Sequence, residues 1–91
     1  MNRDQSIKQL MSIPSIGKSI ANDLWNIGIM KIEDLKGKDP QALYELSNNH
    51  AGVIQDRCLL YCFRCAVYYV NTPPEEQNPK LRLWWNHKDF R

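Results

Sequence analysis

The 91-residue sequence contains little of several residue types that would narrow its function, with only two histidines, three cysteines and four glycines. An odd, clustered set of cysteines does not make a disulfide framework, so we expect a reducing compartment. Twelve lysines and arginines stand against ten aspartates and glutamates, which gives a net charge of +2. This excess is too small for a protein that coats nucleic acid, so any contact with DNA must come from locally placed cations.

Long hydrophobic runs are also missing. The N-terminus has no apolar stretch of signal-peptide length. The most apolar stretch, Leu59–Val70, is interrupted by Arg64 and is too short to cross a bilayer. We therefore expect a cytoplasmic protein without a membrane partner. No Ser/His/Asp or paired-carboxylate arrangement is visible, so we do not expect an enzyme.

The most informative stretch runs from Leu10 to Ala21. Pro14 disfavours helical geometry at the residue before it, so a first helix ends there. Gly17 permits a tight turn and leaves room for a ligand to come close. The next helix starts with unpaired N–H groups, which attract anions such as phosphate. Its buried stripe is marked by apolar residues at helical spacing, namely Ile16, Ile20, Leu24 and Ile27.

Capping signals indicate where other helices begin and end. Ser6 can cap the first helix, and the second is expected over Gly17–Asn26, with Gly28 just past its end. Asp39 and Pro40 mark the start of a third helix, as N-cap and first helical residue.

A long helix is expected from about Val53 to Val70. It is apolar nearly all round, which indicates burial at the centre of the fold or at a homodimer interface. We therefore expect an all-α fold of about five short helices in residues 1–72. An extended proline-rich linker at 73–79 leads to a tail at 80–91 that docks on the same domain.

The paired tryptophans of the tail have two interpretations. Trp84, with Leu81, can anchor the tail on the core. Alternatively, Trp84 and Trp85 can form a stacking surface for nucleic acid beside the neighbouring basic residues.

The turn and its flanks resemble the helix-hairpin-helix motif, which binds nucleic-acid backbones without reading sequence. The matching residues are Ile13-Pro14-Ser15-Ile16-Gly17-Lys18, Ala21, Leu24, Gly28-Ile29 and Ile32-Glu33-Asp34-Leu35. Many DNA-binding members have glycine where this chain has Ser15. A second helix–turn–helix around Asn48–Gly52 lacks the Pro-x-x-Gly pattern. The expected architecture is thus a helix-hairpin-helix (SAM-like) domain with a degenerate second hairpin.

This hypothesis assigns DNA contacts to individual residues. The phosphate-binding set is Ser15, Ile16, Gly17, Lys18 and Ser19, and the secondary contacts are Gly52, Arg57, Lys80, Arg82 and Lys88. The amides of Ile16, Gly17 and Lys18 would hold a phosphate, and the Lys18 and Ser19 side chains would add contacts. Alternatively, the turn only joins two packed helices.

The three cysteines, Cys58, Cys62 and Cys65, are spaced to share one face of the long helix. Because free cysteine is a common small core residue, we expect them to pack there, with no cofactor and no metal. A zinc site that recruits His50 or His87 is the alternative.

The second half of the chain resembles the pathogenicity-locus or mitomycin-resistance family of small bacterial proteins. The residues concerned are Asp56-Arg57-Cys58-x-Leu60-Tyr61-x-Phe63-Arg64-Cys65-Ala66-Val67-Tyr68-Tyr69 and Trp84-Trp85-Asn86-x-Lys88-Asp89. His87 stands where many members have an aromatic residue. The resemblance implies a helix-hairpin-helix fold and a DNA-related role. The expected function is therefore non-sequence-specific DNA binding, as an accessory to DNA repair or damage resistance. The alternative is a protein-interaction or homodimerisation module that does not bind DNA.

Overall fold

The computed structural model describes residues 2–89, and every regular element in that range is helical. The α-helices are α1 (Arg3–Leu10), α2 (Lys18–Asn26), α3 (Pro40–Ala51) and α4 (Arg57–Asn71). One short 3-10 turn, η1 (Ile32–Leu35), lies between α2 and α3. Three more come after α4, namely η2 (Pro74–Glu76), η3 (Pro79–Arg82) and η4 (Trp84–His87). The predicted all-α class is confirmed. Over these residues, no helix combines the length and apolarity that crossing a membrane requires.

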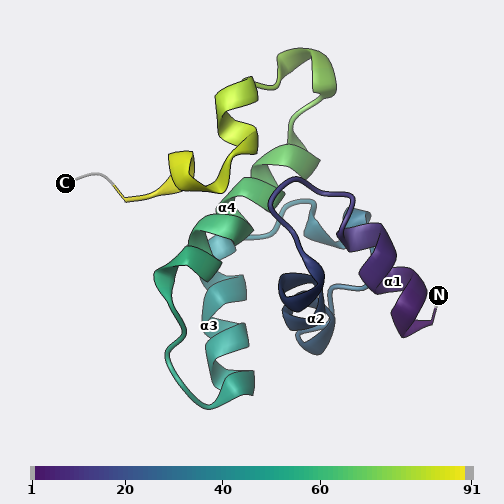
Figure 1. Cartoon of the computed structure of the whole chain (residues 1–91), viewed down its shortest axis with the longest axis vertical. Coiled ribbons are helices and arrows are strands. Elements are labelled where there is room, and N and C mark those ends of the chain that lie inside the picture. The colour runs from purple at the N-terminus through teal and green to yellow at the C-terminus, as the bar shows by residue number, and fades with distance from the viewer. Residues whose placement is uncertain (1, 90–91) are drawn as a thin grey trace.

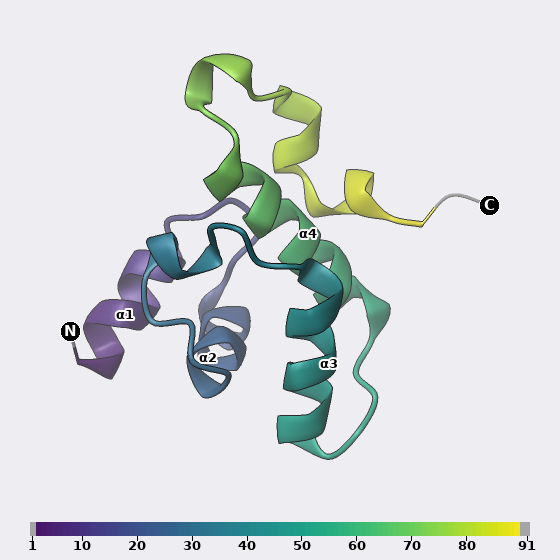
Figure 2. The ribbon, with the colours of Figure 1, turned by 180° about the vertical axis from the view of Figure 1, so that it is seen from behind.

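Helix α4 occupies the middle of the molecule and touches most of the other elements. It runs diagonally between the α1–α2 pair, α3 and the C-terminal segment (Figure 1). Seen from behind, α3 lies along one side of α4, and the segment that carries η3 and η4 lies along another (Figure 2). Both α3 and the C-terminal segment therefore pack on α4.

The inner face of α4 supplies the centre of the core. Its buried residues are Leu59, Leu60, Cys62, Phe63, Cys65 and Ala66. Phe63 and Leu60 are fully enclosed, in one cluster with Leu10 of α1 and Leu24 of α2. Of the two expectations for this helix, central burial is therefore correct for this face, because the chain's own residues cover it.

Two helix starts differ from the sequence-based expectation. Asn2, not Ser6, caps α1, because its side chain accepts from the Gln5 amide while the Gln5 side chain accepts from the Asn2 amide. Ser6 instead lies inside α1 and is buried. Helix α4 begins at Arg57 rather than near Val53, because Asp56 caps it by accepting from the Cys58 amide.

The segment after α4 is held by polar contacts. The proline-rich stretch is not extended throughout, since it folds into η2, and the Gln77 amide donates to the carbonyls of Tyr69 and Thr72 at 3.2 and 2.9 Å. Farther on, Leu81 and Trp84 are only partly buried. Side-chain hydrogen bonds also hold this segment in place.

The central position of α4 predicts that truncating a leucine in α4 and truncating a leucine in α3 change the free energy of unfolding by very different amounts. Leu60→Ala is expected to lower the free energy of unfolding by about 2–5 kcal/mol, because it leaves a cavity in a fully enclosed site. Leu46→Ala in α3, where the side chain is 51% exposed, should change it by about 0.5 kcal/mol or less. Urea denaturation followed by circular dichroism measures both, and similar losses would contradict the described core.

Candidate nucleic-acid interface

The turn between α1 and α2 is shaped by two buried isoleucines and one left-handed residue. Ile13 and Ile16 are 1% and 4% exposed and fix both ends of the turn to the core. Between them, Ser15 has a φ of +72°, the only positive φ outside glycine among residues 2–89. Gly17 has a φ of −89°, which any residue can adopt. Gly17 was expected to permit the tight turn, but the left-handed residue of the turn is Ser15.

Two residues of the predicted phosphate-binding set face the interior of the protein. The Ser15 hydroxyl lies 3.6 Å from the Cys65 sulfur of α4 and donates to the Arg82 carbonyl at 3.4 Å. The Ile16 amide donates to the Ile13 carbonyl at 3.1 Å. These groups are already engaged within the chain, so the expectation that the Ile16 amide holds a phosphate is wrong.

The other three residues of the set form an outward-facing helix start. Gly17 is the N-cap of α2 and offers no side-chain cap, so the first amides of the helix lack partners within it. Gly17, Lys18 and Ser19 are all exposed. A methyl group built on Gly17 would meet nothing within 4 Å, so the space in front of the turn is open. This end of α2 can accept an anion at close range.

The C-terminal segment brings two of the predicted secondary cations to the same place. The Ser15–Arg82 contact and a Cys65 sulfur 3.5 Å from the Leu81 carbonyl hold η3 beside the turn. Lys80 and Arg82 belong to η3, and both are exposed. Arg82 also donates to the Gln77 side chain at 2.9 Å, which orients its guanidinium. Basic residues far apart in the sequence therefore flank one turn.

The other predicted secondary contacts lie elsewhere. Gly52 ends α3 with a φ of +74° at the opposite corner of the chain, between α3 and α4. Arg57 pairs with Asp89, and the Lys88 ammonium sits 5.8 Å above the Trp84 ring. The structure therefore does not join these three residues to the α1–α2 turn in one contact surface.

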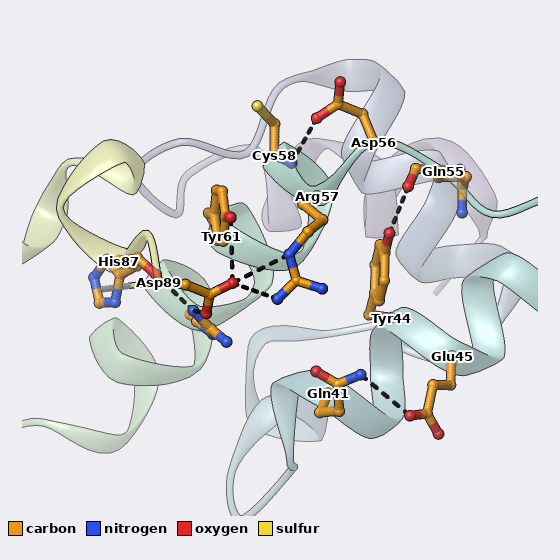
Figure 3. A network of polar contacts seen from close by, with 11 residues as sticks. Gln41, Tyr44, Glu45, Gln55, Asp56, Arg57, Cys58, Tyr61, His87 and Asp89 are labelled. Carbon is orange, nitrogen blue, oxygen red and sulfur yellow. Dashed lines mark hydrogen bonds and ion pairs between the residues drawn. The ribbon is translucent and has the colours of Figure 1, made fainter. Parts of the chain in front are cut away.

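Hydrogen bonds hold the corner between α3 and α4, which carries exposed apolar side chains. The Tyr44 hydroxyl donates to the Gln55 carbonyl (Figure 3). The backbone amide of Gln55 donates to the Asn48 side chain at 3.0 Å. Val53 and Ile54 nevertheless remain 63% and 88% exposed. They line a shallow surface pocket with Asn48, Asn49 and Gly52.

A cluster of charges on the outer face of α4 is the strongest polar site that sequence reasoning missed. Arg57, Tyr61 and Arg64 surround the Asp89 carboxylate, which comes from the last described part of the chain (Figure 3). Hydrogen bonds from Arg64 and Arg57 hold the pKa of Asp89 below its usual range. The helical spacing of the two arginines and Tyr61 was visible in the sequence, but no local pattern connects them to Asp89.

The cysteine thiols lie in different surroundings. Cys62 and Cys65 are buried in the core face of α4, and Cys58 is exposed. Burial raises the pKa of Cys62 to about 11 and also raises that of Cys65, while a hydrogen bond to Asp56 raises that of Cys58. Within residues 2–89, no group of three or more potential ligands gathers in a way that could hold a metal.

The described residues thus define a small all-helical protein with one open helix start flanked by basic residues. Its sequence belongs to the Pathogenicity locus (Cdd1) family, whose model matches residues 3–91. A relative from Streptomyces lavendulae, called "Mitomycin resistance protein McrB", is 32% identical over 82 residues, which cover 90% of this chain and 72% of the relative. No solved structure shows a significant match.

The thiol environments predict an order of alkylation. Under native conditions at pH 8, iodoacetamide should modify Cys58 well before Cys62 or Cys65, because access and thiolate formation are both suppressed in the core. Unfolding in urea should make the three rates similar. Peptide mass spectrometry after brief exposure measures the order, and early labelling of Cys62 in the folded protein would contradict it.

The Asp89 cluster predicts an acid-induced release of the C-terminal segment. The folded-state pKa of Asp89 is lowered, so its stabilising contribution is complete above the ordinary value near 4 and is lost as the pH falls through the lowered value. The groups that face its carboxylate are Arg57, Arg64 and Tyr61. The indole N–H NMR signals of Trp84 and Trp85 should therefore shift below about pH 4.

Asp89→Asn is the control for this titration, because other carboxylates also protonate in acid. In that variant the Trp84 and Trp85 signals should already be displaced at neutral pH and should move less in acid. Identical titrations of the two proteins would show that Asp89 does not hold the segment.

Proposed function

We propose that α1, its turn and α2 form a helix-hairpin-helix unit that binds the phosphate backbone of DNA without reading sequence. The protein would be a cytoplasmic binding protein rather than an enzyme, and an accessory in DNA repair or resistance to DNA damage. Three free thiols are compatible with a reducing compartment. The proposal of a damage-resistance role draws on the name of the relative, which refers to mitomycin resistance.

The open space at Gly17 is the observation that carries the proposal. Neither its φ of −89° nor any neighbouring atom requires a glycine, because an added methyl group would meet nothing within 4 Å. A ligand that approaches the backbone from outside provides a reason for a missing side chain. At the start of a helix, that ligand is favoured to be an anion.

The neighbouring residues support phosphate as the anion. Lys18 and Ser19 in the first turn of α2 can add a cation and a hydroxyl donor, and η3 contributes Lys80 and Arg82 beside the turn. Ser15 adopts the left-handed conformation that glycine favours, and many DNA-binding helix-hairpin-helix proteins have glycine at this position. Such a small surface would contact about two to four phosphates.

A degenerate second hairpin fits the α3–α4 corner. Gly52 ends α3 in the left-handed conformation, and Asp56 caps α4 four residues later. The corner has the order of a helix–turn–helix, but an acidic cap in place of an open helix start. We propose that it contributes little to DNA binding.

A protein-interaction module is the second candidate, and the same corner favours it. Val53 and Ile54 are exposed apolar residues in a loop that hydrogen bonds hold in place, and Leu46 of α3 is also half-exposed. Because α4 buries its own apolar face within the chain, homodimerisation would use this corner rather than α4.

The DNA-binding proposal predicts that two substitutions at the α2 start weaken binding to a fluorescein-labelled duplex at low salt. Gly17→Ala should reduce affinity because its methyl group occupies the open space that the phosphate needs. Lys18→Glu should reduce affinity about five- to tenfold, because it replaces a cation with an anion. The slope of log affinity against log salt should be about −2 to −4 in the wild type.

Lys38→Glu is the matched control, since it makes the same charge change in the exposed loop before α3. If the Lys18 and Lys38 variants lose the same affinity for the duplex, the loss reflects net charge and not a contact at the start of α2. If wild-type protein shows no affinity for duplex, junction or single strand, the interaction module becomes the better account. Light scattering of the wild type and Ile54→Asp then tests for a dimer.

A further inference from the structure

The outer face of α4 concentrates positive charge on a single carboxylate. Tyr61 and Arg64 follow Arg57 by four and seven residues along the helix, so the three side chains share one side of it. The Arg57 and Arg64 guanidiniums lie 5.9 and 5.5 Å from the centre of the Tyr61 ring. The tyrosine ring therefore lies beside both cations.

Asp89 is gripped through both of its carboxylate oxygens. Arg57 donates to Oδ2 through Nε, at 3.1 Å, and through Nη2, and the Tyr61 hydroxyl lies 3.4 Å from the same oxygen. Arg64 contacts Oδ1 through Nη1 at 2.8 Å. Figure 3 shows the Arg57 and Tyr61 side chains of α4 pointing toward the Asp89 carboxylate. Four donor groups from one helix thus surround one acidic group from the end of the chain.

We propose that Arg57, Tyr61 and Arg64 form a phosphate-binding pocket that Asp89 closes in the free protein. Two guanidiniums carry one more positive charge than Asp89 neutralises, so the pocket favours a ligand with more oxygens or more charge than a carboxylate. The planar donor groups of arginine suit phosphate oxygens, and a tyrosine hydroxyl adds a third kind of donor. Asp89 acts as an internal substitute for that phosphate.

The contact is suited to exchange. The Arg57, Arg64 and Asp89 side chains are 51%, 30% and 41% exposed, so a ligand in solution can reach them. Exposed ion pairs are individually weak, so a competing anion can displace the carboxylate. Release would also free Lys88 and the half-exposed Trp85, which lie close to Asp89 in the sequence, to contact the ligand.

The pocket is separate from the α1–α2 turn, but both are in contact with α4. Arg64 belongs to the pocket, while its neighbour Cys65 contacts Ser15 of the turn. The phosphate could belong to inorganic phosphate or to a nucleic-acid strand. Only the second source rests on the proposed function, and displacement of Asp89 by DNA would then couple the C-terminal segment to binding.

Inorganic phosphate tests the pocket without DNA. Titration into ¹⁵N-labelled protein should shift the Arg57 and Arg64 side-chain N–H signals, and Asp89→Asn should tighten the fitted affinity about three- to tenfold, because it removes the internal competitor. Glu75→Gln is the matched control, since it removes one negative charge from exposed η2. Adding Arg57→Gln to Asp89→Asn should abolish the gain. Thermal melts by circular dichroism establish that each variant is folded.

The outcomes separate the two proposals. Equal phosphate affinities in wild type, Asp89→Asn and Glu75→Gln overturn the pocket, and so do equal gains in the two variants. Lys18→Glu should leave phosphate binding at the pocket unchanged, whatever it does to DNA binding. A single-stranded oligonucleotide that binds Asp89→Asn more tightly than wild type identifies nucleic acid as the source. A gain for inorganic phosphate alone supports the pocket and assigns it to free phosphate.

Discussion

The burial of α4 is the constraint on which the remaining structure depends. Its inner face, centred on Leu60 and Phe63, packs in one core with residues of α1, α2 and α3. The other faces of α4 are either covered by another part of the chain or carry charged side chains. Here the C-terminal segment covers one of them, through hydrogen bonds to Tyr69, Cys65 and Arg64 rather than through a second apolar core.

This division explains how a chain with a net charge of +2 can present a local basic surface. Arg57 and Arg64 are used within the protein, where they fix Asp89. Lys80 and Arg82 are carried by η3 to the turn between α1 and α2, where Lys18 begins the next helix. The docking of the C-terminal segment therefore decides which cations are paired and which remain available to an anion.

The turn itself combines packing with an opening. Ile13 and Ile16 tie it to the core, and Ser15 is held in a strained conformation by contacts with Cys65 and Arg82. Immediately afterwards, Gly17 leaves the backbone uncovered. The chain changes from enclosed to open over these three residues, which a turn that only connects two helices does not require. We base the proposed phosphate contact on this change.

Local chemistry determined much of this protein from the sequence alone. The helical class, the end of α1 before Pro14, the cap at Asp39, the positive φ of Gly28 and the family could all be predicted, because each depends on neighbouring residues or on a continuous pattern. The tertiary structure decided the rest. Ser15 turns inward to Arg82, and Arg57 and Arg64 meet Asp89, since contacts between residues up to 67 positions apart leave no periodic trace in the chain.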